Sequence, residues 1–239
     1  MDRFIDKRVF EPLESGNFFN DEDVKSWNDN GILLMRNAIP LERVEKMREI
    51  AAGSFYGDYE WITAPELLSE EIMSHYTSPE VQKPLQALNG ESEVIQGFIY
   101  RKRPRTDVPK NWHQDGVYWG GDTAKVVAIF TPLTEMSKKN GVLWYYPGSH
   151  KLGRLYHRAA PNYNLICDVS AFSEPQCIEI FPGDLFFMHS HLVHASFANE
   201  SDADRLSLGF HVYNKQTNIE INQPVIDDYK RIRAEMGAV

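Results

Sequence analysis

The chain has 239 residues, of which 42% are hydrophobic and 12% aromatic, enough apolar material for a sizeable folded core. Its net charge of -9 argues against a nucleic-acid partner, because broad nucleic-acid binding requires a basic surface. No run of 18 apolar residues could span a bilayer, and the first residues lack the apolar segment of a signal peptide. Cys167 and Cys177 are therefore expected to be free thiols in a reducing cytoplasm.

The first 90 residues are predicted to be mostly helical. Asn20 and the three acidic residues after it are typical of a capped helix start, and a glycine ends the helix. A proline then opens a helix with one apolar face. The predicted elements are, in chain order, a helix from Asn20 to Gly31, a strand over 31–35, a helix between Pro40 and Gly53, and helices over about 65–76 and 79–89.

From Glu93 onward, segments rich in Val, Ile, Phe and Tyr recur with turn residues between them. Many short strands of this kind are typical of a sandwich or barrel. We therefore expect one domain over residues 1–239, mainly β, in which a helical layer (about 1–90) packs on a β-core (about 91–215). The predicted strands cover 93–102, 124–133, 142–147, 176–181, 184–190, 193–198 and 205–213.

Among the eight histidines, His113 is the most informative, because it lies in the sequence Trp112-His113-Gln114-Asp115. On an extended strand, residues i and i+2 point to the same face, so His113 and Asp115 can bind one ion together. With a second histidine from a distant strand, they would form a facial triad of two imidazoles and one carboxylate. Such a triad leaves three positions of an octahedral Fe(II) open for a cosubstrate and O2.

His194 is the favoured second histidine. A hairpin turn around residues 198–201 would place His194 directly opposite Arg205 in the next strand, and cross-strand partners face the same way. Ser196 shares that face by alternation. His191 and His211 fit this register less well.

Arg205 is a candidate partner for a cosubstrate carboxylate. 2-Oxoglutarate chelates iron through its keto-acid end and needs a cation for its far carboxylate, which the planar guanidinium of arginine binds through two parallel hydrogen bonds. The alternative is a surface ion pair with Asp202 or Asp204. The expected position beside His194 and Ser196 favours the cosubstrate role.

These residues belong to a longer pattern that runs from about residue 20 to residue 213. Its segments are Asn30-Gly31-Ile-Leu-Leu-Met-Arg-Asn-Ala, His113-Gln114-Asp115, Asn140-Gly141-Val-Leu-Trp-Tyr-Tyr-Pro147-Gly148-Ser149-His150-Lys151, Pro182-Gly183-Asp184, and His194-Ala-Ser196 followed by Asn199, Ser201 and Arg205. With this pattern, the chain resembles the phytanoyl-CoA dioxygenase family of Fe(II)/2-oxoglutarate-dependent oxygenases. The resemblance implies a double-stranded β-helix, that is, a cupin-like jelly roll, with iron at one open end.

The resemblance also implies the chemistry and the residues that serve it. Fe(II), 2-oxoglutarate and O2 would hydroxylate an unactivated C–H bond of a small molecule and release succinate and CO2. Asp115 favours this outcome over halogenation, since halogenating relatives replace the carboxylate with a small residue. The implied roles are iron binding for His113, Asp115 and His194, binding of the far carboxylate for Arg205 and Ser196, and further cosubstrate contacts for Gln96 and Trp119. His150 is expected to hold a loop rather than the metal.

Residues 101–110 place five cations in ten residues of an acidic chain. By alternation from Gln96, the side chains of Phe98, Tyr100 and Lys102 should face the barrel mouth. One hypothesis is that cations of this segment guide a polar or anionic substrate, and the alternative is a solvated loop. The residues assigned to the substrate are Tyr100 and Trp119 as walls, and Lys102 with Arg103 or Arg105 as cations.

Two other functions are compatible with the sequence. The first is a jelly-roll metal enzyme that does not use 2-oxoglutarate, although such an enzyme has no need for the Ser196 and Arg205 pair. The second is a non-catalytic binding protein on the same fold, which an eroded triad would favour. The sequence leaves the substrate, the oxidation outcome and the oligomeric state open.

Overall fold

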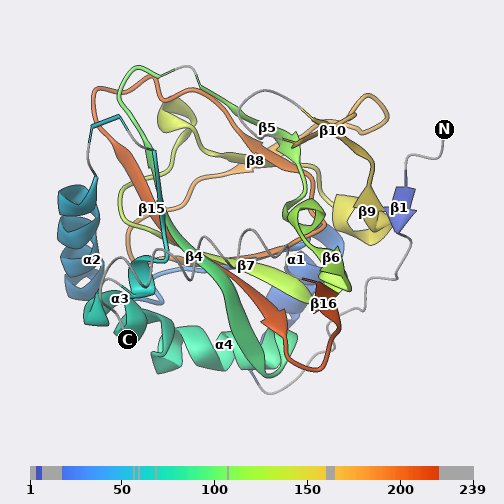
Figure 1. The fold of residues 1–239 in the computed structure, drawn as a ribbon, viewed down its shortest axis with the longest axis horizontal. Coiled ribbons are helices and arrows are strands. Elements are labelled where there is room, and N and C mark those ends of the chain that lie inside the picture. Colours follow the sequence, from blue (N-terminus) through green and yellow to red (C-terminus); the bar gives the residue numbers. More distant parts are fainter. Residues whose placement is uncertain are drawn as a thin grey trace.

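The computed structural model describes residues 4–6 and 18–220, except residues 56, 59, 68, 107 and 160–164. Two antiparallel sheets face each other in the β-core (Figure 1). In spatial order, the six-stranded sheet consists of β2 (Ile32–Met35), β13 (Leu185–His189), β7 (Val126–Pro132), β15 (Arg205–Asn214), β4 (Ser92–Lys102) and β3 (Trp61–Thr63). The four-stranded sheet consists of β12 (Gln176–Ile178), β8 (Leu143–Tyr145), β14 (His194–Ser196) and β5 (Lys110–His113).

Short strand pairs and 3-10 turns connect these sheets. The pairs are β1 (Phe4–Asp6) with β9 (Arg154–Leu155), β10 (His157–Ala159) with β11 (Leu165–Cys167), and β16 (Ile219–Glu220) with β6 (Gly120–Gly121). The turns are η1 (Pro65–Leu67), η2 (Asp115–Tyr118), η3 (Thr123–Lys125), η4 (Lys138–Asn140) and η5 (Ser149–Leu152).

Helices cover the outer face of the six-stranded sheet (Figure 1). They are α1 (Asp21–Asn30), α2 (Leu41–Ser54), α3 (Glu70–Tyr76) and α4 (Pro79–Asn89). At the start of α1, the Asn20 side chain accepts a hydrogen bond from the Asp23 amide, and Gly31 ends the helix with φ +77°, as the sequence predicts. The predicted helix over 65–76 is instead divided into η1 and α3.

Successive side chains of β15 point to opposite faces of the sheet, and each face borders a different part of the interior. Leu206, Leu208, Phe210 and Val212 pack with the helices in one apolar core. The odd-numbered residues point to the other face, where Arg205 and His211 contact residues outside the six-stranded sheet. A second apolar cluster fills the space between the sheets below these polar groups, and it includes Phe186 of β13. The β-core is therefore a jelly roll whose inner face is apolar at depth and polar toward one end.

The predicted hairpin between residues 193 and 213 is wrong. β14 pairs with β5 and β8, whereas β15 pairs with β4 and β7. The chain between them therefore crosses from one sheet to the other instead of turning back beside itself. His194 and Arg205 consequently lie in different sheets, and both still face the interior between the sheets.

The helix-to-strand boundary, the cysteines and the apolar character of the helices were also subjects of prediction from the sequence. The switch from helix to strand falls between Asn89, the end of α4, and Ser92, the start of β4. Both cysteines are free thiols, as predicted. Within the described part of the chain, no helix has the length and apolar character to cross a membrane.

Close packing between β4 and β15 generates a stability prediction. A Cβ at Gly209 would overlap the ring of Phe98, so Gly209→Ala should lower the free energy of unfolding by about 1–3 kcal/mol through overpacking. Gly53→Ala, in a helix with no heavy atom within 4 Å of the added carbon, is the control and should be neutral or slightly stabilising. Urea unfolding measures both. Equal stability of the two variants would contradict the prediction.

Candidate active site

Three buried side chains converge at the polar end of the β-core. His113 ends β5, Asp115 begins η2 and His194 begins β14. The backbone of Gln114 is extended, with φ -117° and ψ 136°, so His113 and Asp115 lie on one side of the chain. His194 pairs directly with His113 in the sheet register. Local extension and cross-strand pairing together therefore bring the predicted triad to one point.

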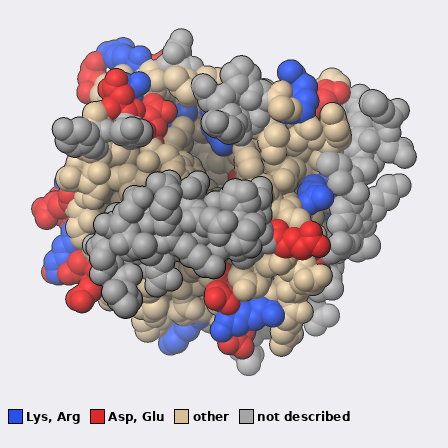
Figure 2. All heavy atoms as spheres, viewed as in Figure 1, with Lys and Arg blue, Asp and Glu red and all other residues tan. Residues whose placement is uncertain are grey.

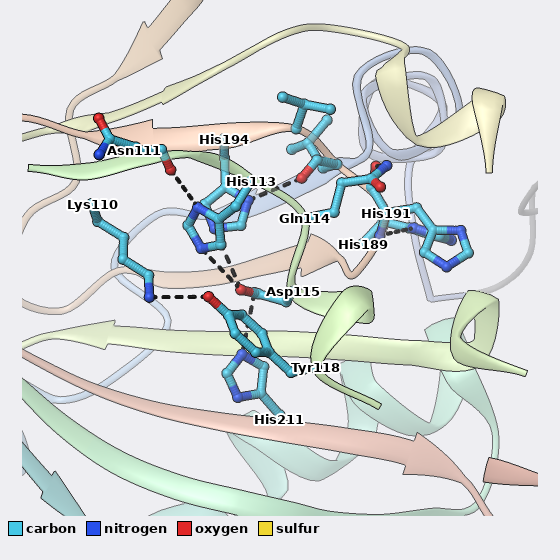
Figure 3. Close-up of polar contacts among 12 residues, drawn as sticks. Lys110, Asn111, His113, Gln114, Asp115, Tyr118, His189, His191, His194 and His211 are labelled. Atoms are coloured by element: carbon cyan, nitrogen blue, oxygen red, sulfur yellow. Dashed lines mark hydrogen bonds and ion pairs between the residues drawn. The ribbon is translucent and has the colours of Figure 1, made fainter. Parts of the chain in front are cut away.

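The triad has the dimensions of a metal site. One ligand atom from each residue lies within 4.8 Å of the others. The Oδ1 atom of Asp115 is 3.4 Å from the Nε2 atom of His113 and 3.6 Å from that of His194 (Figure 3). Two imidazoles and one carboxylate on one side of a shared centre suit an octahedral divalent metal with open positions, such as Fe(II).

Backbone hydrogen bonds orient both imidazoles. The Nδ1 atom of His113 is 2.7 Å from the carbonyl oxygen of Asn111, and that of His194 is 2.9 Å from the carbonyl oxygen of Leu192. A carbonyl can only accept, so Nδ1 carries the proton in each ring and Nε2 presents its lone pair to the centre. Burial lowers the pKa of His194 to about 4, which keeps this ring neutral and able to bind a metal.

Asp115 is held as a carboxylate by its neighbours. Burial would raise its pKa, but the adjacent His194, His211 and His113 outweigh that effect and keep the pKa well below the usual value. The Nε2 atom of His211 lies 3.2 Å from the second carboxylate oxygen, Oδ2. His211 therefore orients the Asp115 carboxylate through its Oδ2 atom. Sequence reasoning missed this role because it considered His211 only as a metal ligand.

Gln114 fixes the turn that carries the triad. Its fully buried amide nitrogen donates to the carbonyls of Gly153 and His191, and its amide oxygen accepts from the backbone of Leu155. These bonds satisfy the whole side chain and tie the His113–Asp115 segment to two other loops. The residue between the two ligands is thus a structural clamp.

The remaining central histidines have structural contacts. The Nε2 atom of His191 is 2.8 Å from the hydroxyl of Thr123. His150 is fully buried against Gly31, where any larger residue would meet its ring. Both residues therefore have contacts outside the triad.

Arg205 offers a binding edge for an anion. Its side chain is 2% exposed, its Nη1 atom donates to the carbonyl of Gly141 at 3.3 Å, and its guanidinium carbon lies 5.0 Å from the centre of the Tyr100 ring. Its Nε and Nη2 atoms are buried and have no hydrogen-bond partner among the described residues. These two atoms form one edge of the guanidinium, the edge that binds a carboxylate through two parallel bonds. Burial also contradicts the alternative of a surface ion pair with Asp202 or Asp204.

Lys102 places a second cation beside this edge. It is the cross-strand partner of Arg205 and has no exposed surface. Its Nζ atom donates to the carbonyls of Val108 at 3.2 Å and Ser196 at 3.3 Å. Burial is the largest cause that lowers the pKa of Lys102 to about 7, and the charge of Arg205 is the second. No ion pair joins either cation to a carboxylate in the part of the chain that the structure describes, so this interior favours an anion.

The other predicted cosubstrate residues lie on the same inner face. Gln96 is the cross-strand partner of His211 and is half-buried. The buried ring of Trp119 stands edge-on to His211, with ring centres 5.0 Å apart. Phe98, on the face shared with Gln96, lies between His211 at 5.1 Å and Phe130 at 5.7 Å. Phe98 and Phe130 thus form an aromatic wall that sequence reasoning did not assign to the site, although alternation along β4 identifies the direction of Phe98.

Two of the predicted substrate cations are turned to the surface. Arg105 forms an exposed ion pair with Asp202 at 2.7 Å, and its backbone has φ +52°. Arg103 pairs with Asp58 at 2.7 Å and with Glu60. Arg105 and Arg103 are therefore not brought to the triad, while Tyr100 and Lys102 lie beside Arg205.

Comparisons with known proteins agree with this geometry. Residues 27–207 match the model of the phytanoyl-CoA dioxygenase (PhyH) family. Phytanoyl-CoA dioxygenase 1 of Oryza sativa subsp. japonica is 25% identical over 218 residues, covering 87% of this chain and 69% of that protein. Among solved structures, iron-bound EctD from S. alaskensis has a TM-score of 0.72 with 17% identity, covering 92% of this chain and 85% of the other. EvdO2 from Micromonospora carbonacea var. aurantiaca, complexed with 2-oxoglutarate, has a TM-score of 0.67 with 20% identity, covering 84% and 94%.

The fold and the site together define an iron- and 2-oxoglutarate-dependent oxygenase built on a jelly roll. The match over residues 27–207 then identifies the family, and the chain belongs to the phytanoyl-CoA dioxygenase family. The expected fold class and cofactors are confirmed on this evidence.

The first site prediction concerns the triad. Replacing His113, Asp115 or His194 with alanine should weaken Fe(II) binding more than about 100-fold, which exceeds the usual effect of removing a residue that only orients a ligand. His191→Ala is the control, since it removes a buried histidine that contacts Thr123, and it should retain iron. Anaerobic titration with Fe(II) measures the affinity, and circular dichroism checks the fold. Wild-type iron affinity in His194→Ala would show that another residue completes the site.

Proposed function

We propose that His113, Asp115 and His194 bind one Fe(II), and that Arg205 and Ser196 bind the far carboxylate of 2-oxoglutarate. The protein then hydroxylates an unactivated C–H bond of a small molecule and releases succinate and CO2. The observation that carries this proposal is the buried edge of Arg205, whose Nε and Nη2 atoms have no described partner. Arg205 lies in the six-stranded sheet, and His113 and His194 lie in the four-stranded sheet that faces it. A carboxylate fits both features, because it satisfies two donors at once and offsets the buried charge.

Each side chain has a definite task in this proposal. Asp115 and the Nε2 atoms of the two histidines hold the metal in place. The metal and the 2-oxo acid supply the oxidising chemistry with O2 when they are bound. Arg205 and Ser196 orient the cosubstrate from its far end, with Tyr100 packed beneath the guanidinium. Gln96, Trp119 and the wall of Phe98 and Phe130 limit the access of water.

The two buried cations, Arg205 and Lys102, distinguish this function from its alternatives. A jelly-roll enzyme without 2-oxoglutarate, or a binding protein, gives no reason for two buried cations beside a metal site. Succinate release is the direct test. Protein incubated with Fe(II), 2-oxoglutarate and O2 should form succinate slowly without substrate, and Asp115→Ala should form none. Iron-loaded protein that releases no succinate under any condition would favour the alternatives.

We also propose that the protein works in a reducing cytoplasm on small molecules, without a nucleic-acid partner. The free thiols of Cys167 and Cys177 are compatible with that compartment. The acidic net charge of -9 supports the absence of a nucleic-acid partner.

The second site prediction concerns the cosubstrate. Arg205→Ala should weaken 2-oxoglutarate binding by roughly 2–5 kcal/mol, because a buried carboxylate then loses its charged partner. Arg105→Ala, which removes an exposed arginine paired with Asp202, should leave binding unchanged. An anaerobic titration of Fe(II)-loaded protein should show the visible charge-transfer band of a chelated 2-oxo acid. Loss of this band is expected for Arg205→Ala at concentrations that saturate the wild type. Absence of the band from iron-loaded wild type would refute the cosubstrate assignment.

The pH dependence of cosubstrate binding provides a third prediction. The pKa of Lys102 is lowered to about 7 by burial and by Arg205, with Glu60 acting in the opposite direction and Lys110 in the same one. The charged form predominates below pH 7 and attracts a dianion, so 2-oxoglutarate should bind more weakly as the pH rises through 7. Lys102→Met should bind more weakly at pH 6 and lose most of this dependence. The measurement is the dissociation constant between pH 6 and 8, and a dependence of equal size in both proteins would exclude Lys102 as its source.

A further inference from the structure

The five cations between residues 101 and 110 have different surroundings, and Lys110 contacts the turn that carries Asp115. Lys102 faces the cosubstrate pocket, whereas Arg103 and Arg105 form surface ion pairs. Arg101 donates to the carbonyl of Gly57 at 2.6 Å. The Nζ atom of Lys110 instead lies 3.3 Å from the hydroxyl oxygen of Tyr118, a residue of the same turn as Asp115 (Figure 3).

Lys110 and Tyr118 form a pair at the edge of the metal site. Lys110 is in β5, the edge strand of the four-stranded sheet, and is the register partner of Ser196. Its ammonium nitrogen is 5.4 Å from the centre of the Tyr118 ring. That ring in turn stands edge-on to His113, with ring centres 6.3 Å apart. A positive charge and a hydroxyl group therefore lie together beside one metal ligand.

The pair has the hydrogen-bonding capacity to hold an oxyanion. The hydroxyl oxygen of Tyr118 lies within hydrogen-bond distance of the Lys110 ammonium, and a phenol can donate a hydrogen bond as well as accept one. Lys110 carries three N–H donors. An ammonium and a phenol side by side are a suitable set of donors for a carboxylate or a phosphate group.

The pair differs from the two buried cations in its exposure. Arg205 and Lys102 lie in the six-stranded sheet and are almost completely buried. Lys110 and Tyr118 are half-buried, so each keeps a surface that a ligand can contact. On the face seen in Figure 2, acidic and basic side chains alternate around the periphery. Among the residues that Figure 2 colours, no broad basic surface would attract an anion, so the proposed recognition depends on particular donors.

We propose that Lys110 and Tyr118 bind an oxyanion of the substrate, a carboxylate or a phosphate-type group, and thereby position the reacting carbon beside the metal. This inference rests on the proposed function, because it assumes that the triad and Arg205 already hold Fe(II) and 2-oxoglutarate. It moves the basic substrate contact from Arg105 to Lys110 within the same segment of the chain.

The test uses the protein loaded with Fe(II) and 2-oxoglutarate under anaerobic conditions. Acetate and inorganic phosphate, as separate titrants at constant ionic strength, probe the two classes of oxyanion, and the charge-transfer band of the bound 2-oxo acid reports their arrival. We expect a saturable shift of the band with at least one of the two anions. Lys110→Met should weaken that response roughly tenfold, which is about 1.4 kcal/mol. Tyr118→Phe should weaken it less, and Lys110→Arg should restore part of it.

Lys151→Met is the matched control, since it removes a lysine that is paired with Asp29 at the surface, and its response should equal that of the wild type. The affinity for 2-oxoglutarate should stay within about twofold in every variant, a change of less than half a kcal/mol. A response that persists unchanged in Lys110→Met, or no saturable response to either anion in wild type, would overturn the inference. So would weaker 2-oxoglutarate binding in Lys110→Met, because Lys110 would then belong to the cosubstrate pocket. Absence of the band from iron-loaded wild type would instead refute the proposed function itself.

Discussion

Buried charge between the two sheets is the constraint on which the rest of the structure depends. Asp115 carries a negative charge at one point, and Arg205 carries a positive charge elsewhere on the inner face. No ion pair joins them among the described residues, although direct pairing would be the simplest way to reduce the free-energy cost of burial. Each charge is instead oriented toward a separate partner. In the proposed function, a divalent cation and a dianionic cosubstrate would neutralise both charges, and the uncompensated charges would contribute to the free energy of binding.

Such a polar interior requires a stable scaffold around it. The even-numbered residues of β15 pack with the helices in one apolar core, and Phe186 belongs to a second apolar cluster between the sheets. These two cores supply the hydrophobic free energy that offsets the desolvation of the charged end. Gln114 and His211 then fix the turn and the carboxylate of Asp115 through hydrogen bonds. Apolar burial therefore stabilises the fold, while the polar contacts determine the geometry of the site.

Sequence reasoning selected the triad and Arg205 as candidate site residues, although one step of its geometry was wrong. The motif around His113 depends on local extension over two residues, which the sequence alone can predict. The link between His194 and Arg205 assumed a hairpin, whereas the chain crosses between sheets at that point. Both residues still face the interior, since alternation decides the facing side within each strand, whatever its neighbours are. Strand pairing is a long-range property, so the position of His211 behind Asp115 could not be predicted in the same way.

The basic segment shows the same division between local and long-range information. Alternation predicted that Lys102 faces inward with Tyr100, and both are neighbours of Arg205 on the inner face. Arg105 is paired with Asp202, which lies far away in the sequence. Lys110 contacts Tyr118 of the η2 turn, eight residues further along the chain, and strand alternation predicts neither contact. Charge density along the sequence therefore locates a functional region without identifying which cation acts in it. The active side chain is defined by the neighbour that the fold places next to it, and for Lys110 that neighbour belongs to the turn that carries Asp115.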